Sequence, residues 1–470
     1  MFPKFYTSKA ISYYLAVLFL VNIVFFNRMM PLIWWLFGIV AVVGFFNGTR
    51  SLITKWADIP EKTYIKKLFQ TALIIRVIYV VVMYFLYTVL TGSPFEFGAG
   101  DVMFYHNIAQ FGADCLWDGK FDLTTQFWTQ DPDIDFSDMG YPIYLSVIYA
   151  ITGKSILLAR IIKAIWSAWM CVLVYRLATR NFGEQVGRMA GIFVMLMPNF
   201  IYYTAIHLKE TEMVFLTVLF VERADYLMRG RDFSFKAIFP IMLIAGTLFM
   251  FRTALAATAV FSLFTAVFLT SKRVLKIEKK IVLGVWVFVT IGYFIGGTVA
   301  TEIQTLWESR IGVKEAGFTE METRKGGNTL VKYIAGVSFA PFIFVVPLPT
   351  IINIEHQQNQ QLAHGGYYIK NIMAFFVILA LYYVIKEKRW SDYLLFGSFI
   401  IGYLVVISLS RFAASERFHL PALPFILIIA AYGITLVNAK QKKLYNTWVV
   451  IIFVIIIAWS WFKLAGRGLA

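Results

Sequence analysis

Charged residues are scarce in this 470-residue chain, at 15% of the total, and only two cysteines occur, Cys115 and Cys171. A water-soluble domain carries roughly a quarter charged residues, whereas here 59% of the residues are hydrophobic and 18% are aromatic. Too little polar surface is present to cover a soluble fold, and the apolar content also excludes intrinsic disorder. The composition therefore predicts a polytopic membrane protein.

Motifs for metals, disulfides and nucleotides are also lacking. Cys171 lies in an apolar run and Cys115 in a polar loop, so we expect no disulfide between them and no zinc or haem site. The phosphate-binding pattern G-x-x-x-x-G-K-S/T is absent, and Gly98 and Gly100 lack the third glycine of a dinucleotide-binding loop. A substrate carried on a lipid is therefore favoured over a soluble nucleotide, and ATP-driven transport is disfavoured.

Acidic residues are the rarer charge, 27 against 43 lysines and arginines, which gives a net charge of +16. In a membrane protein such an excess is typical of cytoplasmic loops, so we expect lipid and no nucleic acid as partner. Basic clusters recur in alternate loops, including 48–67 and 272–280. This alternation predicts a cytoplasmic N-terminus and an external C-terminus.

A membrane span needs about 20 mostly apolar residues, and about thirteen runs approach that length. They are 11–26, 31–47, 68–92, 155–177, 186–203, 209–226, 237–251, 253–271, 281–302, 367–386, 393–410, 419–437 and 446–462. Two more apolar runs do not fit the count. Residues 141–152 are too few and are expected along the interface, while 332–354 is interrupted by prolines and is expected to be re-entrant or a broken helix.

The external face collects the ionisable groups. The loop 93–140 holds nine acidic residues against one lysine, Lys120, and the five histidines all fall on the same side: His106, His207, His356, His364 and His419. Within the spans, Arg76 is the main exception. A transporter that binds its substrate at the bilayer midplane would place polar groups there. The sequence instead places its candidate chemistry at the outer interface.

Four short motifs share that outer side. They are Gly100-Asp101, Tyr141-Pro142, the run from Gly153 to Arg160, and a late Arg417-Phe418-x-x-Pro421. Their order along the chain and their shared position on the outer side resemble those of motifs in the GT-C superfamily of glycosyltransferases. The resemblance is nearest to bacterial relatives of the protein mannosyltransferases and the lipid A aminoarabinose transferase (glycosyltransferase families 39 and 83), and it is best over 95–225 and 411–433.

The resemblance implies a GT-C-like catalytic domain over 68–470 with an external loop 93–153, preceded by a helical hairpin and cytoplasmic loop over 1–67. It implies an inverting transfer of a sugar from a polyprenyl-phosphate carrier to a hydroxyl of a glycan, lipid or protein. The active site would face the periplasm from the inner membrane. Asp101 would be the catalytic base, since a nearby carboxylate can take the hydroxyl proton. Alternatively, Asp101 caps a helix that begins near Val102.

Cations would bind the donor phosphate. Arg160 and Lys163 lie three residues apart on one helix face, and Lys209 and Arg417 approach from other spans. Alternatively, these side chains reach the interface and bind ordinary lipid. Glu210 is the second catalytic candidate and could orient Lys209 or contact the sugar, although a carboxylate at a helix start is common. The remaining substrate-binding candidates follow Asp101: they are Tyr105 and His106, the latter roughly on the same helical face.

No cofactor is expected. The run Asp131-x-Asp133-x-Asp135 fails the calcium-loop pattern, because its sixth position is Phe136 and its twelfth is Pro142. A looser divalent-cation site that includes Asp101 stays an alternative. Two other functions also stay open: a polysaccharide polymerase or ligase that uses a lipid-pyrophosphate donor, and a lipid-carrier flippase or transporter. The enzyme predicts a charged cavity open to the outside, whereas the transporter has no need of Asp101.

Overall fold

The structure is a computed structural model. It describes residues 3–132, 134, 136–229, 235–269, 277, 281, 284–285, 344–355, 357–408, 415–465, 467 and 469. Within these residues every regular element is a helix. This agrees with the predicted all-α membrane protein. The expected span 281–302 and the basic segment 272–280 lie almost entirely outside the described residues.

Among the described residues, six helices are long and apolar enough to cross a bilayer: α1 (Lys4–Val24), α2 (Leu32–Lys55), α3 (Glu61–Thr91), α7 (Ile156–Phe182), α16 (Gln358–Lys386) and α20 (Ala439–Ala465). Four shorter apolar helices accompany them: α11 (Phe235–Phe251), α12 (Thr253–Leu269), α17 (Leu394–Ser408) and α19 (Leu423–Thr435). The count of about thirteen full spans therefore stays a prediction.

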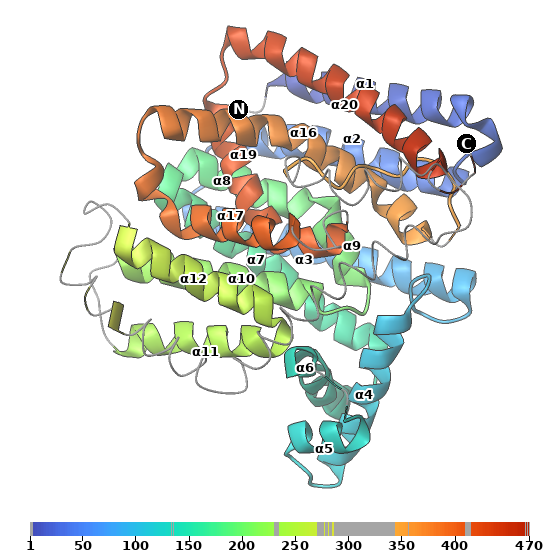
Figure 1. Ribbon diagram of the computed structural model, residues 1–470, viewed down its shortest axis with the longest axis vertical. Coiled ribbons are helices and arrows are strands. Elements are labelled where there is room, and N and C mark those ends of the chain that lie inside the picture. The colour runs from blue at the N-terminus through green and yellow to red at the C-terminus, as the bar shows by residue number, and fades with distance from the viewer. Residues whose placement is uncertain are drawn as a thin grey trace.

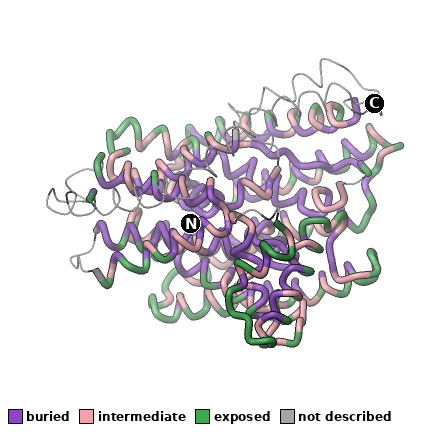
Figure 2. The backbone as a smooth tube through the Cα atoms, turned by 60° about the horizontal axis from the view of Figure 1, so that its bottom comes forward, coloured by how far each residue is buried: buried purple, intermediate pink, exposed green. Residues whose placement is uncertain are grey.

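Large apolar side chains cover much of the outside of the helix bundle, as expected where lipid is the solvent. Ile23, Ile78, Phe85 and Phe261 are all more than half exposed. The buried residues form the interior of the same bundle (Figure 2). The first and last helices lie side by side along one edge (Figure 1), where the rings of Tyr6 and Tyr445 pack 4.6 Å apart.

The predicted single span 186–203 is wrong in one respect, because it is two helices. α8 (Glu184–Leu196) ends before Met197, and α9 (Pro198–Ala205) begins with the proline. Proline has no N–H to continue the first helix, but it suits the first turn of the next one. The last carbonyls of α8 are therefore left without helical partners.

Arg76 of α3 fills this break between α8 and α9. Its guanidinium donates to Met195 O and Val194 O, both at 3.2 Å, and its Nε donates to Ser167 Oγ at 2.6 Å. The side chain is fully buried. This cation, which the sequence shows as an isolated charge in a span, is thus satisfied by carbonyl and hydroxyl oxygens.

We expect Arg76→Met to lower the free energy of unfolding by about 1–3 kcal/mol, because the carbonyls and the Ser167 hydroxyl would lose their donor. Thermal unfolding in detergent measures the change. Lys66→Met on the same helix is the matched control, since Lys66 is exposed and its loss should cost less than about 0.5 kcal/mol. Equal stability of both variants would contradict the structural role of Arg76.

Three helices project from one end of the bundle: α4 (Gly100–Trp117), α5 (Leu123–Gln130) and α6 (Phe136–Thr152) (Figure 1). The short apolar run expected at 141–152 is the greater part of α6, which extends further toward the N-terminus than predicted. Of the segment 332–354, the structure describes only 344–354, and this part is not helical.

Candidate active site

Asp101 lies in the first turn of α4, which begins at Gly100. Gly98, with φ of +64°, turns the chain into this helix in a conformation that glycine adopts without strain. The N-cap of α4 is Ala99, and no side chain caps the helix. The alternative of Asp101 as a helix cap is therefore wrong. Its carboxylate is 62% exposed and accepts a hydrogen bond from Arg417 instead.

Arg417 joins Asp101 to Glu210. It lies on the one-turn helix α18 (Glu416–His419), and its Nη1 donates to Asp101 while its Nε donates to Glu210 Oε1. Glu210 is the first residue of α10 (Glu210–Arg229) and is fully buried. Burial alone would lower the pKa of Arg417, but the two carboxylates raise it above its ordinary value. Three predicted site residues therefore meet in one cluster.

Arg252 belongs to the same cluster, although the sequence analysis did not select it. It separates α11 from α12, and its Nη2 lies 3.8 Å from Glu210 Oε1. Its guanidinium carbon also lies 4.5 Å from the centroid of the Phe418 ring, a favourable cation–π distance. The signal for Arg252 was its position: it is a lone charge between two apolar runs.

Lys209 is held by Asp138, a partner that its sequence context did not indicate. Its Nζ donates to Asp138 Oδ1 and, at 2.7 Å, to Phe251 O. Tyr105 donates to the same carboxylate oxygen at 3.1 Å. Burial alone would raise the pKa of Asp138, but the charge of Lys209 and these hydrogen bonds lower it. Asp138 was one acidic residue among nine in its loop, so the sequence held no signal that singled it out.

The other two predicted phosphate ligands, Lys163 and Arg160, differ in whether their hydrogen-bond donors have partners. Lys163 donates to Ile206 O at 2.8 Å and to Leu208 O, and lies 3.6 Å from Glu212 Oε2. Arg160 is equally buried, yet its Nε, Nη1 and Nη2 have no hydrogen-bond partner among the described residues. A buried guanidinium without partners is costly. Among the four predicted cations, Arg160 has the most donors left for a ligand.

His106 contacts Tyr149 and not Asp101. Its Nδ1 lies 2.7 Å from the Tyr149 hydroxyl, which lies 2.9 Å from His207 Nε2. Burial and the nearby charge of Arg160 lower the pKa of both histidines, that of His207 strongly. The hydroxyl thus links two uncharged rings from different segments. This arrangement fits a support beside the site better than a direct partner of Asp101.

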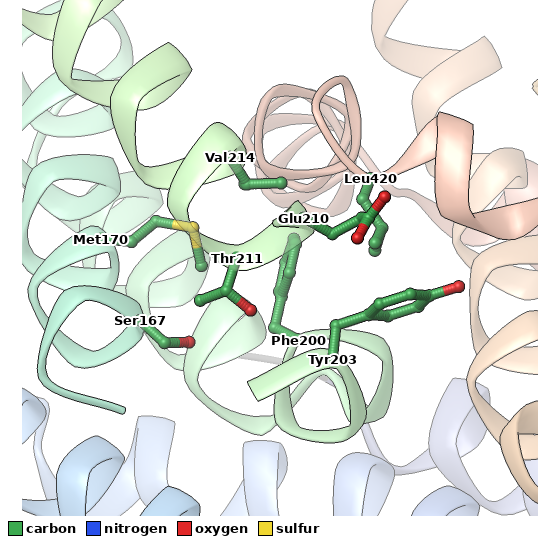
Figure 3. A pocket seen from close by; sticks show the side chains of 8 residues that line it. All are labelled: Ser167, Met170, Phe200, Tyr203, Glu210, Thr211, Val214 and Leu420. Atoms are coloured by element: carbon green, nitrogen blue, oxygen red, sulfur yellow. The ribbon is translucent and has the colours of Figure 1, made fainter. Parts of the chain in front are cut away.

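A small cavity lies beside the buried carboxylate of Glu210 (Figure 3). The carboxylate is at one end with Leu420, and the hydroxyls of Ser167 and Thr211 are at the other. The remaining lining residues are Met170, Phe200, Tyr203 and Val214. There is room for only about one water molecule. This is too small to be the charged, outward-opening substrate cavity that the resemblance implies.

Within the described part of the chain, no three histidine, cysteine, aspartate or glutamate side chains are grouped so that they could hold a metal ion. Asp133 and Asp135 of the acidic run lie outside that part. The divalent-cation alternative at Asp101 thus has no support from neighbouring ligands. Asp101 has an arginine beside it, whose positive charge opposes a second cation at the same carboxylate.

No protein-family model matches this chain, and no curated protein matches it significantly. The likeness to GT-C glycosyltransferases therefore depends on the short motifs in the sequence.

Proposed function

We propose that this protein is a membrane glycosyltransferase that moves a sugar from a polyprenyl-phosphate donor to an extracytoplasmic hydroxyl of a glycan, lipid or protein. The observation that supports this most is the contact between Asp101 and Arg417, which are 316 positions apart in the chain. Both come from motifs of the proposed family. In the proposed function, Asp101 is the proton acceptor and Arg417 the phosphate ligand, and their contact supports this pairing.

In the proposed reaction, the acceptor oxygen attacks the anomeric carbon of the sugar and the bond from that carbon to the phosphate oxygen breaks. The phosphate leaves with the bonding electrons and the configuration inverts. Asp101, whose carboxylate is largely exposed, takes the hydroxyl proton. Arg417 stabilises the departing phosphate through charge-assisted hydrogen bonds. Glu210, buried behind it, acts by orienting Arg417.

Arg160 and the lysines have distinct parts in this proposal. Arg160 has unmet donors in a buried position, which suits a second phosphate contact. Lys209 is already bound by Asp138, and Lys163 is bound by the carbonyl oxygens of residues 206 and 208. They therefore shape the site and add positive charge more than they bind phosphate directly.

Purified protein in lipid nanodiscs tests the proposal when radiolabelled sugars on polyprenyl phosphate and on polyprenyl pyrophosphate are supplied with an envelope extract as acceptor. Transfer from the monophosphate donor alone supports the proposal. Transfer only from the pyrophosphate donor would favour the polymerase or ligase. Absence of transfer from either donor, with well-folded protein, would contradict both enzyme proposals.

A lipid-carrier flippase is the second candidate, because buried charge also occurs near the middle of two spanning helices. Lys370 lies near the middle of α16 and Arg76 near the middle of α3, and Lys370 is 3.9 Å from the buried Glu416. Charges at this depth are typical of transport pathways. Flipping of a fluorescent polyprenyl phosphate in proteoliposomes, unchanged by Asp101→Asn, would favour the flippase.

The proposed orientation puts Asp101 at the periplasmic face and the start of α20 in the cytoplasm. We expect an impermeant thiol reagent to label Asp118→Cys in intact spheroplasts and to label Lys440→Cys only after lysis. Both native side chains are exposed, and the two native cysteines are buried, so the background should be low. Labelling in the reverse order would invert the topology and move the site to the cytoplasm.

A further inference from the structure

The helix that carries Arg417 is a single turn. α18 consists of four residues, Glu416–His419. One helical turn is not stable alone, because forming it fixes several dihedral angles for little hydrogen bonding. The direction of Arg417 must therefore depend on what holds the neighbouring side chains of α18.

Both ends of α18 contact one buried lysine. Lys370 of α16 places its Nζ 2.9 Å from His419 Nδ1 and 3.9 Å from Glu416 Oε2. The same ammonium group donates to Val346 O at 2.7 Å. An ammonium has three donors and no acceptor, so it donates to His419 Nδ1. All three side chains are nearly or fully inaccessible to solvent.

Glu416 has a second support at its other carboxylate oxygen. Asn199 of α9 donates from Nδ2 to Glu416 Oε1 at 2.8 Å. α16 can approach this asparagine because it has Gly366 there, where a Cβ atom would lie only 2.3 Å from Asn199 Oδ1. The carboxylate of Glu416 is thus held between α9 and α16.

The two middle residues of α18 make the contacts of the candidate site. Arg417 donates to Asp101 and Glu210, and the ring of Phe418 lies against Arg252. Residues three apart share one face of a helical turn, so Glu416 and His419 lie on one face and anchor the turn. Arg417 and Phe418 lie on other faces of the turn. A rotation of α18 would move Arg417 away from both carboxylates.

We propose that Lys370 is a positioning residue that aims Arg417 at Asp101 and Glu210 by holding both ends of α18. Its kinetic consequence rests on the proposed glycosyltransferase function. Its geometric consequence does not, because the direction of Arg417 can be measured in a protein of any activity. Two experiments separate the two consequences.

The geometric experiment uses a short bifunctional thiol reagent on the full chain, with Cys115 and Cys171 replaced by alanine and with Asp101→Cys and Arg417→Cys introduced. We expect Lys370→Met to reduce the cross-linked fraction several-fold. Glu416→Gln keeps the size of the side chain and weakens its attraction to Lys370, so it should also reduce the cross-linked fraction. This variant replaces Lys370→Met in the experiment if Lys370→Met does not fold. An unchanged cross-linked fraction in the folded variant would overturn the proposal.

Two controls accompany this experiment. Gln361→Met alters another fully buried polar residue of α16, which donates to Ile354 O, and should leave the cross-link intact. The pair Asp114→Cys with Lys154→Cys replaces an ion pair of 2.6 Å away from α18 and should cross-link equally with and without Lys370→Met. A loss in either control would mean general loosening of the fold and would overturn the positioning role.

The kinetic experiment is a double-mutant cycle on transfer. If Lys370 acts through Arg417, Lys370→Met should lower the transfer rate about tenfold in the otherwise native chain and less than about twofold in the Arg417→Ala background. Equal losses in both backgrounds would overturn the proposal. If the native chain transfers no sugar, the proposed function fails, and the cross-linking result still decides the role of Lys370.

Discussion

Asp101→Asn is expected to reduce sugar transfer by about 10² or more while donor binding survives, because an amide cannot accept the acceptor's proton. The amide oxygen can still accept a hydrogen bond from Arg417, and α4 does not use Asp101 as its cap. Folding should therefore change little. Single-turnover transfer and donor binding, measured on the same preparation, separate the two effects.

Asp114→Asn and Asp118→Asn are the matched controls for this prediction. Both side chains are about as exposed as Asp101, and they pair with Lys154 and Lys120 instead of Arg417. If general negative charge in the external loop were responsible, all three variants would lose transfer alike. Near-normal transfer by Asp101→Asn would remove it from the mechanism and make Glu210 the next candidate for the base.

Arg417→Ala is expected to weaken binding of the polyprenyl-phosphate donor by about 1.5–3 kcal/mol, the strength of a charge-assisted hydrogen bond. The same change removes one of the two arginines beside Glu210, which is fully buried. Loss of one partner of a buried ion pair is itself destabilising, by about 3–5 kcal/mol. Titration of the donor and thermal unfolding measure the two consequences independently.

The double variant Arg417→Ala with Glu210→Gln distinguishes the two consequences. Neutralising the carboxylate removes a buried charge that has lost the nearer of its two arginines, so the double variant should recover much of the stability lost by Arg417→Ala. Donor binding should stay weak, because the phosphate ligand is still missing. Recovery of binding together with stability would show that Arg417 supports the fold and does not contact the donor.

The residues of the candidate site were more predictable from the sequence than their contacts. Asp101 and Arg417 were selected from two separate motifs and Glu210 as a carboxylate at a helix start, and the three residues meet. The pairing of Lys209 with Asp138 and the approach of Arg252 to Glu210 were missed. Nothing local marks such contacts, because each depends on where a distant helix ends. Arg252 and Lys209 converge because α11 ends at Phe251, whose carbonyl binds Lys209.

Composition by itself determined that this protein is embedded in lipid and that its fold is all-α. Backbone groups in lipid must be satisfied within each segment, so long apolar runs can only become helices. The sequence also offered a signal for the break at Pro198, since proline removes one helical hydrogen bond and suits the first turn of a new helix. The signal is not decisive, because Pro142 lies inside α6 and Pro240 inside α11. Only the tertiary structure decided how the charges are satisfied. Arg76 is satisfied by carbonyls and Lys370 by the two ends of α18, whereas the guanidinium of Arg160 has no hydrogen-bond partner in the part of the chain that the structure describes. The physical reason is that burial makes the energy of each charge depend on partners within a few ångströms, and those partners come from remote parts of the chain.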